Sequence, residues 1–446
     1  MKTGKSFSLS LLLWLLLAWG YDGWLPRISM GDEENGNIII TADEIREMNA
    51  HKMADVLNHV PGVSAGDSSV SIHGSYKVKV FVDGRPINDP TSGYGGVNWE
   101  LVTPGDVARI EIMRGKGGMR YGKDASGGVI LITTKRVRKL TGNAKAYGGN
   151  HETGYGYANV RMTSGKWTLG ATGGYETTGG YKINNDKERY QCGAKLGYRG
   201  GDKKQVTFLA DYLEDERGLS GTPAHPTPDS RKTSKNTNLS FQAVFSPVTS
   251  VTSFNEGRTH NIDVTRDLDQ TYRVTQWVED LSAILKNRWG DLSMGGGYEL
   301  GKAEGSTFDN QTEHTISLFS AQTLKLPVKP LTLCLGVRAN INSEFDNTIN
   351  PEVKAMYKKE RWRTSVSYTK TDNTPSFRQR YNRTSSTDPN PDLDMETSDN
   401  FNLGVFITPV DRLSLSLTFF HNRLNDRITY VTDDETGMCR YENFSL

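Results

Sequence analysis

One glycine-rich segment of the chain has the spacing of a phosphate-binding loop. Residues 117–123 read GGMRYGK and fit the pattern G-x-x-x-x-G-K, in which backbone N–H groups and the lysine hold phosphate oxygens. That chemistry also needs a Ser or Thr directly after the lysine to bind Mg²⁺, and a helix behind the loop. Here Asp124 follows Lys123, and a strand is predicted next. The sequence therefore predicts no phosphate site at this position.

A second segment places a serine in a setting that superficially resembles the nucleophile segment of trypsin-like proteases. Residues 124–128 read DASGG, but an activated serine needs a histidine base that a carboxylate orients. His73 falls on a predicted strand and His421 at the end of another, and neither context indicates a base. We therefore predict no catalytic residue and no enzymatic activity.

Metal ligation is not indicated either. One group of carboxylates contains oxygen ligands of the kind that Ca²⁺ takes: Asp388, Asp392, Asp394 and Glu396. The group lacks the spacing and the central glycine of an EF-hand loop, so a solvated acidic loop is the better prediction. The cysteines are odd in number and far apart, which fits neither a disulfide framework nor a zinc site: Cys192, Cys334 and Cys439. The sequence predicts no metal and no cofactor.

Composition limits the class of protein. The 446 residues carry 53 Lys and Arg against 52 Asp and Glu, a net charge of +1, so no basic field is available to hold a nucleic acid. Hydrophobic residues make up 35% and the mean hydropathy is −0.56, which excludes a membrane protein built from apolar helices of about 20 residues. A membrane β-barrel remains possible because only alternate residues of its strands face lipid, and 46 Gly with 19 Tyr suit such walls and turns.

The first 20 residues are predicted to be a secretory signal peptide. Lys2 and Lys5 precede an apolar run over residues 9–18, which is too short to span a bilayer. Small residues at Ala18 and Gly20 favour cleavage after Gly20. A buried core helix is the alternative, but nothing amphipathic surrounds the run. Residues 21–37 would then form an N-terminal extension on the periplasmic side.

A compact α+β unit is expected over residues 38–138. Apolar residues recur at helical spacing over residues 41–60, where Thr41 and Glu44 fit a capping box. Short alternating strands are expected at residues 70–73, 78–82, 107–113 and 129–134, with turn signals between them. The unit has about the usual size of a domain, roughly 100 residues.

From residue 139 onward, strand-like runs of about ten residues with period-two alternation return again and again, as in a barrel wall. Short connections such as residues 164–166 and 246–248 indicate tight turns, whereas residues 214–236 and 372–399 indicate long external loops. Strands are expected at residues 154–162, 167–175, 205–213, 237–245, 292–300, 315–324, 363–369, 400–406 and 413–419.

An ordered series of motifs resembles the plug of TonB-dependent outer-membrane receptors. These motifs are ADVLNHVPGV at 54–63, VSIHG at 70–74, VFVDGRPIND at 80–89, VARIEIMRG at 107–115, YG at 121–122, ASGGVI at 125–130 and TTK at 133–135. Further on, NP at 350–351, PSF at 375–377, NPDL at 390–393 and ETS at 396–398 resemble the family's late barrel region. The resemblance therefore runs over essentially the whole mature chain.

This resemblance implies a mainly β fold, a transmembrane antiparallel β-barrel with an N-terminal α+β plug domain in its lumen, in the outer membrane of a Gram-negative bacterium. It implies energised uptake of a large scarce nutrient such as a ferric siderophore or cobalamin. The implied partners are the periplasmic energy-coupling protein TonB, outer-membrane lipid and a siderophore- or cobalamin-like ligand. A truncated, non-transporting barrel remnant or a passive surface-binding protein is the alternative. An outer-membrane hydrolase lacks a credible nucleophile and base.

Two sets of residues are candidates for contacts with these partners. Asn88, Asp89, Tyr94 and Trp99 lie in or beside a plug loop whose polar and aromatic groups could point outward to bind ligand, and a solvated turn is the alternative. Ile38, Ile39, Ile40 and Thr41 resemble the TonB-contacting segment in composition, but their direct continuation into the predicted helix favours the plug's first strand. His73 stands where the family usually has arginine, which predicts a weaker contact between plug and wall.

The length of the wall is the remaining expectation. Residues 139–446 have room for roughly 15 or 16 strands, fewer than the about 22 that enclose a plug. The final residues, YENFSL at 441–446, lack the terminal aromatic of the family. We therefore expect an incomplete barrel over residues 139–446, in a family member truncated at its C-terminus.

Overall fold

A computed structural model describes residues 33–34, 37–93, 95–135, 139–201, 203–221, 226–326, 330–383, 387–410, 413–432 and 438–444. The predicted signal peptide, residues 1–20, and nearly all of the predicted extension, residues 21–37, lie outside the described residues. Among the described residues, no helix combines the length and apolar character needed to cross a membrane.

Residues 33–135, called the N-terminal unit below, form a small α+β structure. Its six-stranded sheet has the order β1-β2-β7-β8-β5-β6, in which β5 and β8 are parallel and the other neighbours antiparallel. The predicted strands are confirmed to within one residue at either end. The elements are β1 (Glu33–Glu34), β2 (Asn37–Thr41), α2 (Ala42–Glu47), α3 (Met53–Asn58), β3 (Val63–Gly66), β4 (Ser69–Ile72), β5 (Val78–Val82), β6 (Arg85–Pro86), η1 (Trp99–Leu101), η2 (Pro104–Asp106), β7 (Val107–Arg114), α4 (Gly118–Tyr121) and β8 (Gly128–Thr134).

The single helix predicted over residues 41–60 is wrong, because two short helices, α2 and α3, occupy this stretch. The capping box is confirmed: the Glu44 backbone N–H donates to Thr41 Oγ1 at 3.4 Å, and the Thr41 backbone N–H donates to Glu44 Oε2 at 2.7 Å. The break falls at Asn49, whose φ of 49° is left-handed and ends α2 where helical periodicity would have carried it on. Both helices still bury apolar residues in one core.

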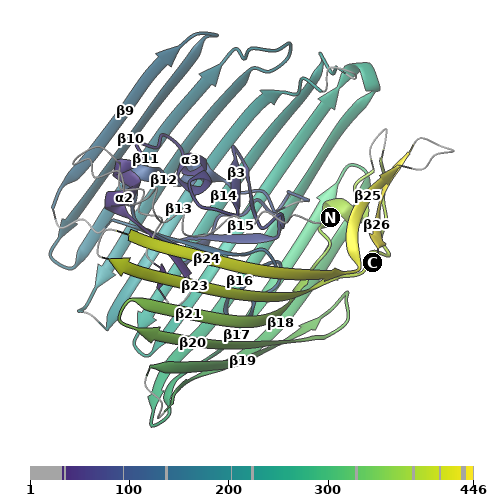
Figure 1. Cartoon of the computed structure of the whole chain (residues 1–446). Helices are drawn as coiled ribbons and strands as arrows, with labels where there is room; N and C mark the ends of the chain where they lie inside the picture. Colours follow the sequence, from purple (N-terminus) through teal and green to yellow (C-terminus); the bar gives the residue numbers. More distant parts are fainter. Residues whose placement is uncertain are drawn as a thin grey trace, which may run out of the picture. The chain divides into compact units, whose positions relative to one another are not determined.

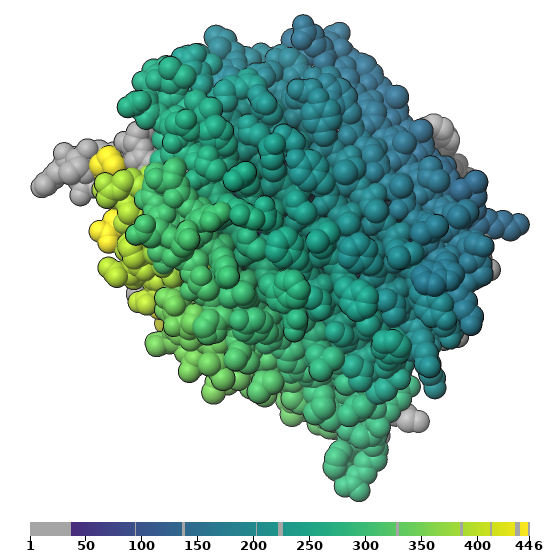
Figure 2. All heavy atoms as spheres, turned by 180° about the vertical axis from the view of Figure 1, so that it is seen from behind, coloured from purple at the N-terminus to yellow at the C-terminus, as the bar shows by residue number. Residues whose placement is uncertain are grey.

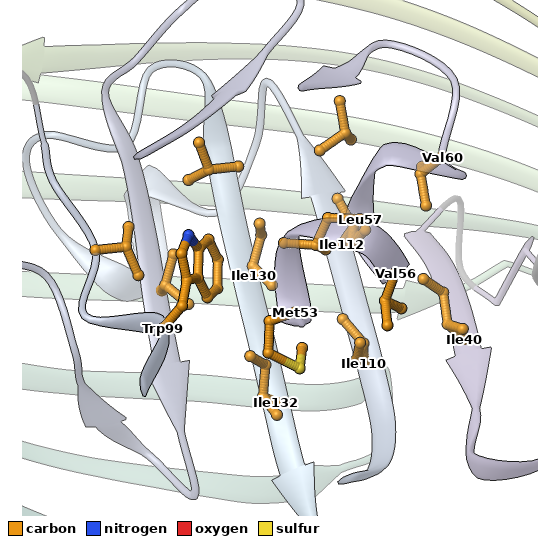
Figure 3. Packing of buried hydrophobic residues seen from close by; sticks show 14 of the residues in the cluster. Ile40, Met53, Val56, Leu57, Val60, Trp99, Ile110, Ile112, Ile130 and Ile132 are labelled. Carbon is orange, nitrogen blue, oxygen red and sulfur yellow. The ribbon is translucent and has the colours of Figure 1, made fainter. Parts of the chain in front are cut away.

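The core of the N-terminal unit lies between these helices and the six-stranded sheet (Figure 3). Ile110 and Ile112 of β7 and Ile130 of β8 are fully buried, and Met53 and Leu57 of α3 pack against them. Each such side chain contributes about 1.5–3 kcal/mol on leaving water. This apolar core holds the helices and strands of the N-terminal unit together and so positions the polar loops that connect them.

A 15-stranded antiparallel sheet, called the large sheet below, follows, with β9 and β24 at its two ends (Figure 1). Its size agrees with the roughly 15 or 16 strands expected from wall length, and each predicted strand lies within an observed one. The strands are β9 (Thr141–Gly149), β10 (Thr153–Ser164), β11 (Trp167–Thr178), β12 (Lys187–Arg199), β13 (Lys204–Gly218), β14 (Ser230–Phe245), β15 (Val248–Asp263), β16 (Leu268–Asn287), β17 (Gly290–Gly305), β18 (Phe308–Lys325), β19 (Leu331–Asn342), β20 (Thr348–Lys359), β21 (Trp362–Asn373), β23 (Glu396–Val410) and β24 (Leu413–Asn425).

Connections in the large sheet differ in part from those expected. The tight turns at residues 164–166 and 246–248 are confirmed. The loop expected at residues 214–236 is wrong at both ends, because β13 runs on to Gly218 and β14 already begins at Ser230. Between β21 and β23 the chain forms α5 (Phe377–Tyr381) and β22 (Thr387–Asp388), and β22 joins β25 (Arg427–Thr432) and β26 (Cys439–Phe444) in a three-stranded sheet.

The two faces of the large sheet differ in chemistry. In β23, Asn400 and Asn402 are buried, whereas Phe401 and Leu403 between and after them are 48% and 36% exposed. The leucines of β24 at 413, 415 and 417 are likewise exposed. Residues of the large sheet form the surface seen from behind (Figure 2). An apolar outer face with a polar inner face is the pattern of a wall that meets lipid.

Candidate functional site between the N-terminal unit and the large sheet

The polar inner face of the large sheet holds the N-terminal unit through charged and hydrogen-bonded contacts. One anchor is Asp106, at the end of η2, which is 7% exposed. Its Oδ2 accepts hydrogen bonds from Tyr157 Oη at 2.9 Å and Asn159 Nδ2 at 2.7 Å, and Arg161 Nη2 lies at 3.4 Å. Thr103 Oγ1 donates to the same carboxylate at 3.0 Å. A single side chain of the unit thus binds three successive inward-facing residues of β10.

A second anchor joins η1 to β12 and β13. Arg189 forms an ion pair with Glu100 of the N-terminal unit, and its Nε donates to Asp215 Oδ2 at 2.8 Å. Glu176 Oε2 lies 3.3 Å from Arg189 Nη1, so one guanidinium serves three carboxylates. Burial raises the pKa of Glu100, against the opposing effect of the Arg189 charge.

A third anchor contains the glycine-rich segment with phosphate-loop spacing. Gly117, with φ 101°, precedes α4, which begins at Gly118. Arg120 Nη1 of α4 reaches Asp280 Oδ1 at 3.1 Å, and Lys123 Nζ, just after α4, reaches Glu299 Oε1 at 3.6 Å. Burial opposes the charge of Lys123, yet Glu299 and neighbouring carboxylates hold its pKa above the usual range. The lysine is already neutralised by wall carboxylates, which fits an anchor and not a phosphate site.

The fourth anchor faces β21 and the residue that follows it. Asp124 Oδ1 accepts from the Thr374 backbone N–H at 2.8 Å, and Ser126 Oγ accepts from Asn373 Nδ2 at 2.9 Å. Gly118 packs so closely that an added Cβ would lie 2.9 Å from Thr371 Cγ2. The serine and aspartate of the protease-like segment are therefore engaged in contacts to the wall.

His73 of the N-terminal unit makes a different kind of contact with the large sheet, at β24. Its ring stacks on Phe420 of β24, with centroids 3.6 Å apart and planes 6° from parallel. Burial, helped by the charge of Arg114, lowers the pKa of His73 to about 4, so the ring is neutral at pH 7. An aromatic stack thus stands where we expected the contact between plug and wall to be weaker.

The structure separates the residues predicted to bind ligand. Asn88 is turned inward: its side chain accepts from the Val80 backbone N–H at 2.9 Å and donates to Val78 O at 2.9 Å. Asp89 Oδ1 accepts from the Thr91 backbone N–H at 2.9 Å, and both Asn88 and Asp89 line a cavity of about 1020 Å³ between the N-terminal unit and the large sheet. Tyr94 lies outside the described residues.

Trp99 does not point outward, so this part of the expectation is wrong. Its side chain is 5% exposed, belongs to the core of the N-terminal unit and donates from Nε1 to Ser69 O at 3.3 Å. Burying a large aromatic ring is more favourable in free energy than exposing it to water, even when the ring lies beside a polar loop. Ligand contact by Asn88 and Asp89 stays a prediction.

The alternative interpretations of the segment from Ile38 to Thr41 can now be compared. Ile38, Ile39 and Ile40 are 8%, 4% and 1% exposed and form β2, which pairs with β7 on one side and β1 on the other. The favoured prediction is confirmed in that these residues form a strand of the plug, but β1 precedes it in the same sheet, so it is not the first strand. Strand addition by TonB at these residues would first require β2 to leave its sheet.

Sequence reasoning missed the wall partners of the N-terminal unit. Tyr157, Asn159 and Arg161 alternate along β10, and Arg189 and Asp215 lie on the inner faces of their strands. Polar residues at every second position of a predicted wall strand were the available signal. Among the described residues, no three His, Cys, Asp or Glu side chains are grouped so that they could hold a metal ion.

Two family models match the chain. The model described as "TonB dependent receptor-like, beta-barrel" matches residues 130–445, and the model described as "TonB-dependent Receptor Plug Domain" matches residues 33–129. Their boundary falls within β8, whereas the predicted division after residue 138 falls between β8 and β9.

Relatives of known name share shorter segments with the chain. Vitamin B12 transporter BtuB of Vibrio vulnificus strain CMCP6 is 31% identical over 171 residues, 36% of this chain and 27% of that protein. Ferric enterobactin receptor PirA of Pseudomonas aeruginosa is 34% identical over 124 residues, 23% of this chain and 16% of that protein. The matched segments thus span well under two thirds of these relatives.

Solved structures resemble the chain over nearly its full length. The siderophore receptor PirA from Pseudomonas aeruginosa superposes with a TM-score of 0.74 at 19% identity, covering 93% of this chain and 80% of that one. The copper transporter OprC gives a TM-score of 0.73 at 13% identity, covering 94% and 75%. At such identities the likeness establishes the fold alone.

Proposed function

Because the chain belongs to the TonB-dependent receptor family of the Gram-negative outer membrane, we propose that it imports a large scarce nutrient in an energised, TonB-coupled step. The N-terminal unit is the family's plug, and the large sheet is its barrel wall. Family membership makes the protein a receptor of a transport family and not an enzyme.

The observation that carries this proposal is the way the plug is held. Its contacts to the wall include charged and hydrogen-bonded side-chain pairs, with Asp106, Glu100 and Arg120 as plug partners. The apolar contacts are separate patches, His73 on Phe420 and Met119 against Phe319. The polar contacts can exchange with water when the plug moves, whereas a continuous apolar interface would not reopen readily. A plug that is anchored by polar pairs and borders a cavity suits a protein that opens a path on demand.

The proposed ligand is a ferric siderophore or a cobalamin-like molecule. Relatives that match the chain are named as a vitamin B12 transporter and a ferric enterobactin receptor, which supports both classes. Asn88 and Asp89 are the proposed ligand contacts, since they border the cavity on a loop of the plug and functional residues concentrate on such loops.

Uptake in cells that express the chain tests the proposal. Radiolabelled ferric siderophores and cobalamin are offered with and without a proton-gradient uncoupler, and binding is measured separately in the cold. We expect accumulation of one ligand that the uncoupler abolishes, with binding retained. Binding without accumulation, or accumulation indifferent to the uncoupler, contradicts energised import and supports the passive surface-binding alternative.

A matched pair of variants tests the proposed contacts. Asp89→Ala should weaken ligand binding, by roughly tenfold for one lost charged or hydrogen-bonded contact. Asp67→Ala is the control, because Asp67 is an exposed plug aspartate that pairs with Lys52 at 3.1 Å and does not border the cavity. Equal affinities of the two variants would contradict the assignment of Asp89.

A further inference from the structure

The outer face of the large sheet carries charged side chains beyond its apolar part, and Arg258 of β15 is one of them. β15 begins at Val248, in the short turn at residues 246–248, and short turns mark the periplasmic side of such walls. Arg258 is ten positions further along the strand and therefore lies toward the opposite side of the membrane. Its neighbours Gly257 and Thr259 are buried against the plug, so Arg258 between them points outward, where it is exposed.

Three cations lie directly opposite one another on this face. In the register of the sheet, Arg258 faces Lys235 of β14 on one side and Arg273 of β16 on the other. The Cβ atoms of directly opposite residues are about 4.5–5.5 Å apart, and like charges at that spacing destabilise a sheet. We call Lys235, Arg258 and Arg273 the cationic row.

Carboxylates flank the cationic row but leave its middle uncovered. Lys235 Nζ lies 2.8 Å from Glu214 Oε1 of β13, and Arg273 Nη1 lies 3.2 Å from Glu304 Oε1 of β17. Arg273 also pairs with Glu256. The side chain of Arg258, by contrast, has no ion pair and no hydrogen bond within the described part of the chain. The central guanidinium is thus surrounded by cations whose carboxylates lie elsewhere.

An aromatic pair shows how deep the cationic row lies in the membrane. Phe254, on the same face of β15, packs edge-on against Trp277 of β16, with ring centroids 6.5 Å apart. Trp277 is 41% exposed, and exposed aromatic girdles mark the borders of the apolar band in membrane barrels. Arg258 is four residues beyond Phe254, about 13 Å along the strand and less along the membrane normal because strands tilt. The row therefore lies just outside the apolar band, within reach of lipid head groups.

A further exposed cation lies between the cationic row and this border. Lys302 of β17 is directly opposite Thr275 of β16, which is two residues from Arg273 and two from Trp277. Lys302, like Arg258, has no ion pair among the described residues. Arginine binds phosphate through its planar fork and lysine as a point charge. Two such cations at the edge of the apolar band form a surface suited to phosphate.

We propose that the cationic row, together with Lys302, binds the phosphate groups of a lipid in the outer leaflet. The acyl chains of this lipid lie along the exposed apolar side chains on the periplasmic side of the row, which include Leu239 and Phe241 of β14 and Leu281 of β16. The phosphate supplies the anion that Arg258 lacks and relieves the repulsion within the row. The surface lies on the outside of the wall, away from the plug, so the inference is independent of the proposed import.

Lipid binding by the purified full chain tests this proposal. The probe is diphosphoryl lipid A, compared with the same lipid after both phosphates are removed, in micelles of an uncharged detergent, and bound lipid is counted by native mass spectrometry. We expect the phosphorylated lipid to bind at least about tenfold more tightly, because the acyl chains are shared and only the phosphates differ. Equal affinities would overturn the proposal.

Inorganic phosphate distinguishes a lipid from a free anion. Because it has no acyl chains, a large excess of inorganic phosphate should leave binding of the lipid unchanged. Complete displacement of the lipid by inorganic phosphate would show a site for a free anion and refute the assignment to a lipid.

A matched pair of variants tests the position of the site. Arg258→Gln should weaken binding of the phosphorylated lipid by about tenfold, since one charged contact is lost. Arg423→Gln is the control, because Arg423 of β24 is also exposed but lies directly opposite Asp399 and not opposite a cation. Equal losses in both variants would indicate attraction to overall charge and overturn the assignment to the cationic row.

Arg258→Glu separates binding from folding. Without lipid, this variant should unfold at a temperature no lower than the parent, because a carboxylate between Lys235 and Arg273 replaces repulsion by attraction. Phosphorylated lipid should raise the thermal midpoint of the parent but not that of the variant. An equal rise in both, or a lower midpoint of the variant without lipid, would contradict the proposal. These measurements need neither nutrient nor TonB, so their failure leaves the proposed import standing.

Discussion

Replacing Asp106 with asparagine tests how firmly the plug is anchored to the wall. The substitution keeps the shape of the side chain but removes its charge and puts an N–H₂ group among donors. Tyr157 Oη at 2.9 Å, Asn159 Nδ2 at 2.7 Å and Arg161 Nη2 at 3.4 Å would face it. Since Arg161 is 14% exposed and Asp106 9% exposed at the side chain, the cation loses its partner in a largely buried setting.

The magnitude follows from this geometry. A hydrogen bond to a charged group contributes about 1.5–3 kcal/mol, and breaking a buried ion pair costs about 3–5 kcal/mol. We expect about 3 kcal/mol of local destabilisation, which raises the population of the detached state roughly a hundredfold. Hydrogen exchange of the amides in η2 and β9, measured in detergent micelles, reports that population directly.

Two further variants control this experiment. Asp67→Asn removes an exposed pair with Lys52, which contributes about 0–1 kcal/mol, so exchange near η2 should change less than about fivefold. Tyr157→Phe, combined with Asp106→Asn, should be less harmful than the sum of the single variants because both disturb one contact. If Asp106→Asn and Asp67→Asn change exchange equally, the anchor contributes nothing and the reasoning fails.

Three other predictions concern the plug. His73 has a lowered pKa of about 4. Its contribution to stability is therefore present above its unfolded pKa near 6.5 and is lost as the pH falls toward 4. The thermal midpoint should drop more between pH 7 and 4.5 in the wild type than in His73→Asn. Trp99→Ala should cost about 3–5 kcal/mol in the plug's free energy of unfolding without changing ligand affinity per folded molecule; lower affinity at unchanged stability would contradict a core role. Gly128→Ala should abolish the heat-modifiable folded band on gels, because φ is 136° and the new Cβ would lie 2.0 Å from Met113 O, whereas Gly156→Ala meets no atom within 4 Å and should fold normally.

What could be predicted from the sequence depended on how local the signal is. Thr41 and Glu44 are three residues apart, so their capping box could be read directly and is confirmed. The break at Asn49 could not, because a single left-handed residue leaves the apolar periodicity on either side nearly intact.

Contacts between distant parts of the chain were out of reach for a different reason. Glu100 and Arg189 are 89 positions apart, and their pairing depends on how the plug is seated against β12. Trp99 was assigned outward because its neighbours are polar, but burial is decided by the packing of the whole unit. The inward alternation of Tyr157, Asn159 and Arg161 marked the wall's polar face without naming its plug partner.

The distribution of contacts around the plug argues for local and not global movement. Releasing the whole plug means breaking the charged anchors of Asp106, Glu100 and Arg120. Because the partners of the first two, Arg161 and Arg189, are 14% and 7% exposed, each of these two breaks costs about 3–5 kcal/mol. Releasing plug residues 88–92 means breaking three neutral hydrogen bonds to β15 and β16, at about 1 kcal/mol each. It also separates the Asp89 carboxylate from the nearby positive charge of Lys232. Because Asn88 and Asp89 already border the cavity of about 1020 Å³, movement of residues 88–92 would open onto preformed space. In the proposed transport step, a pull on the plug therefore need not expel the whole plug to open a path.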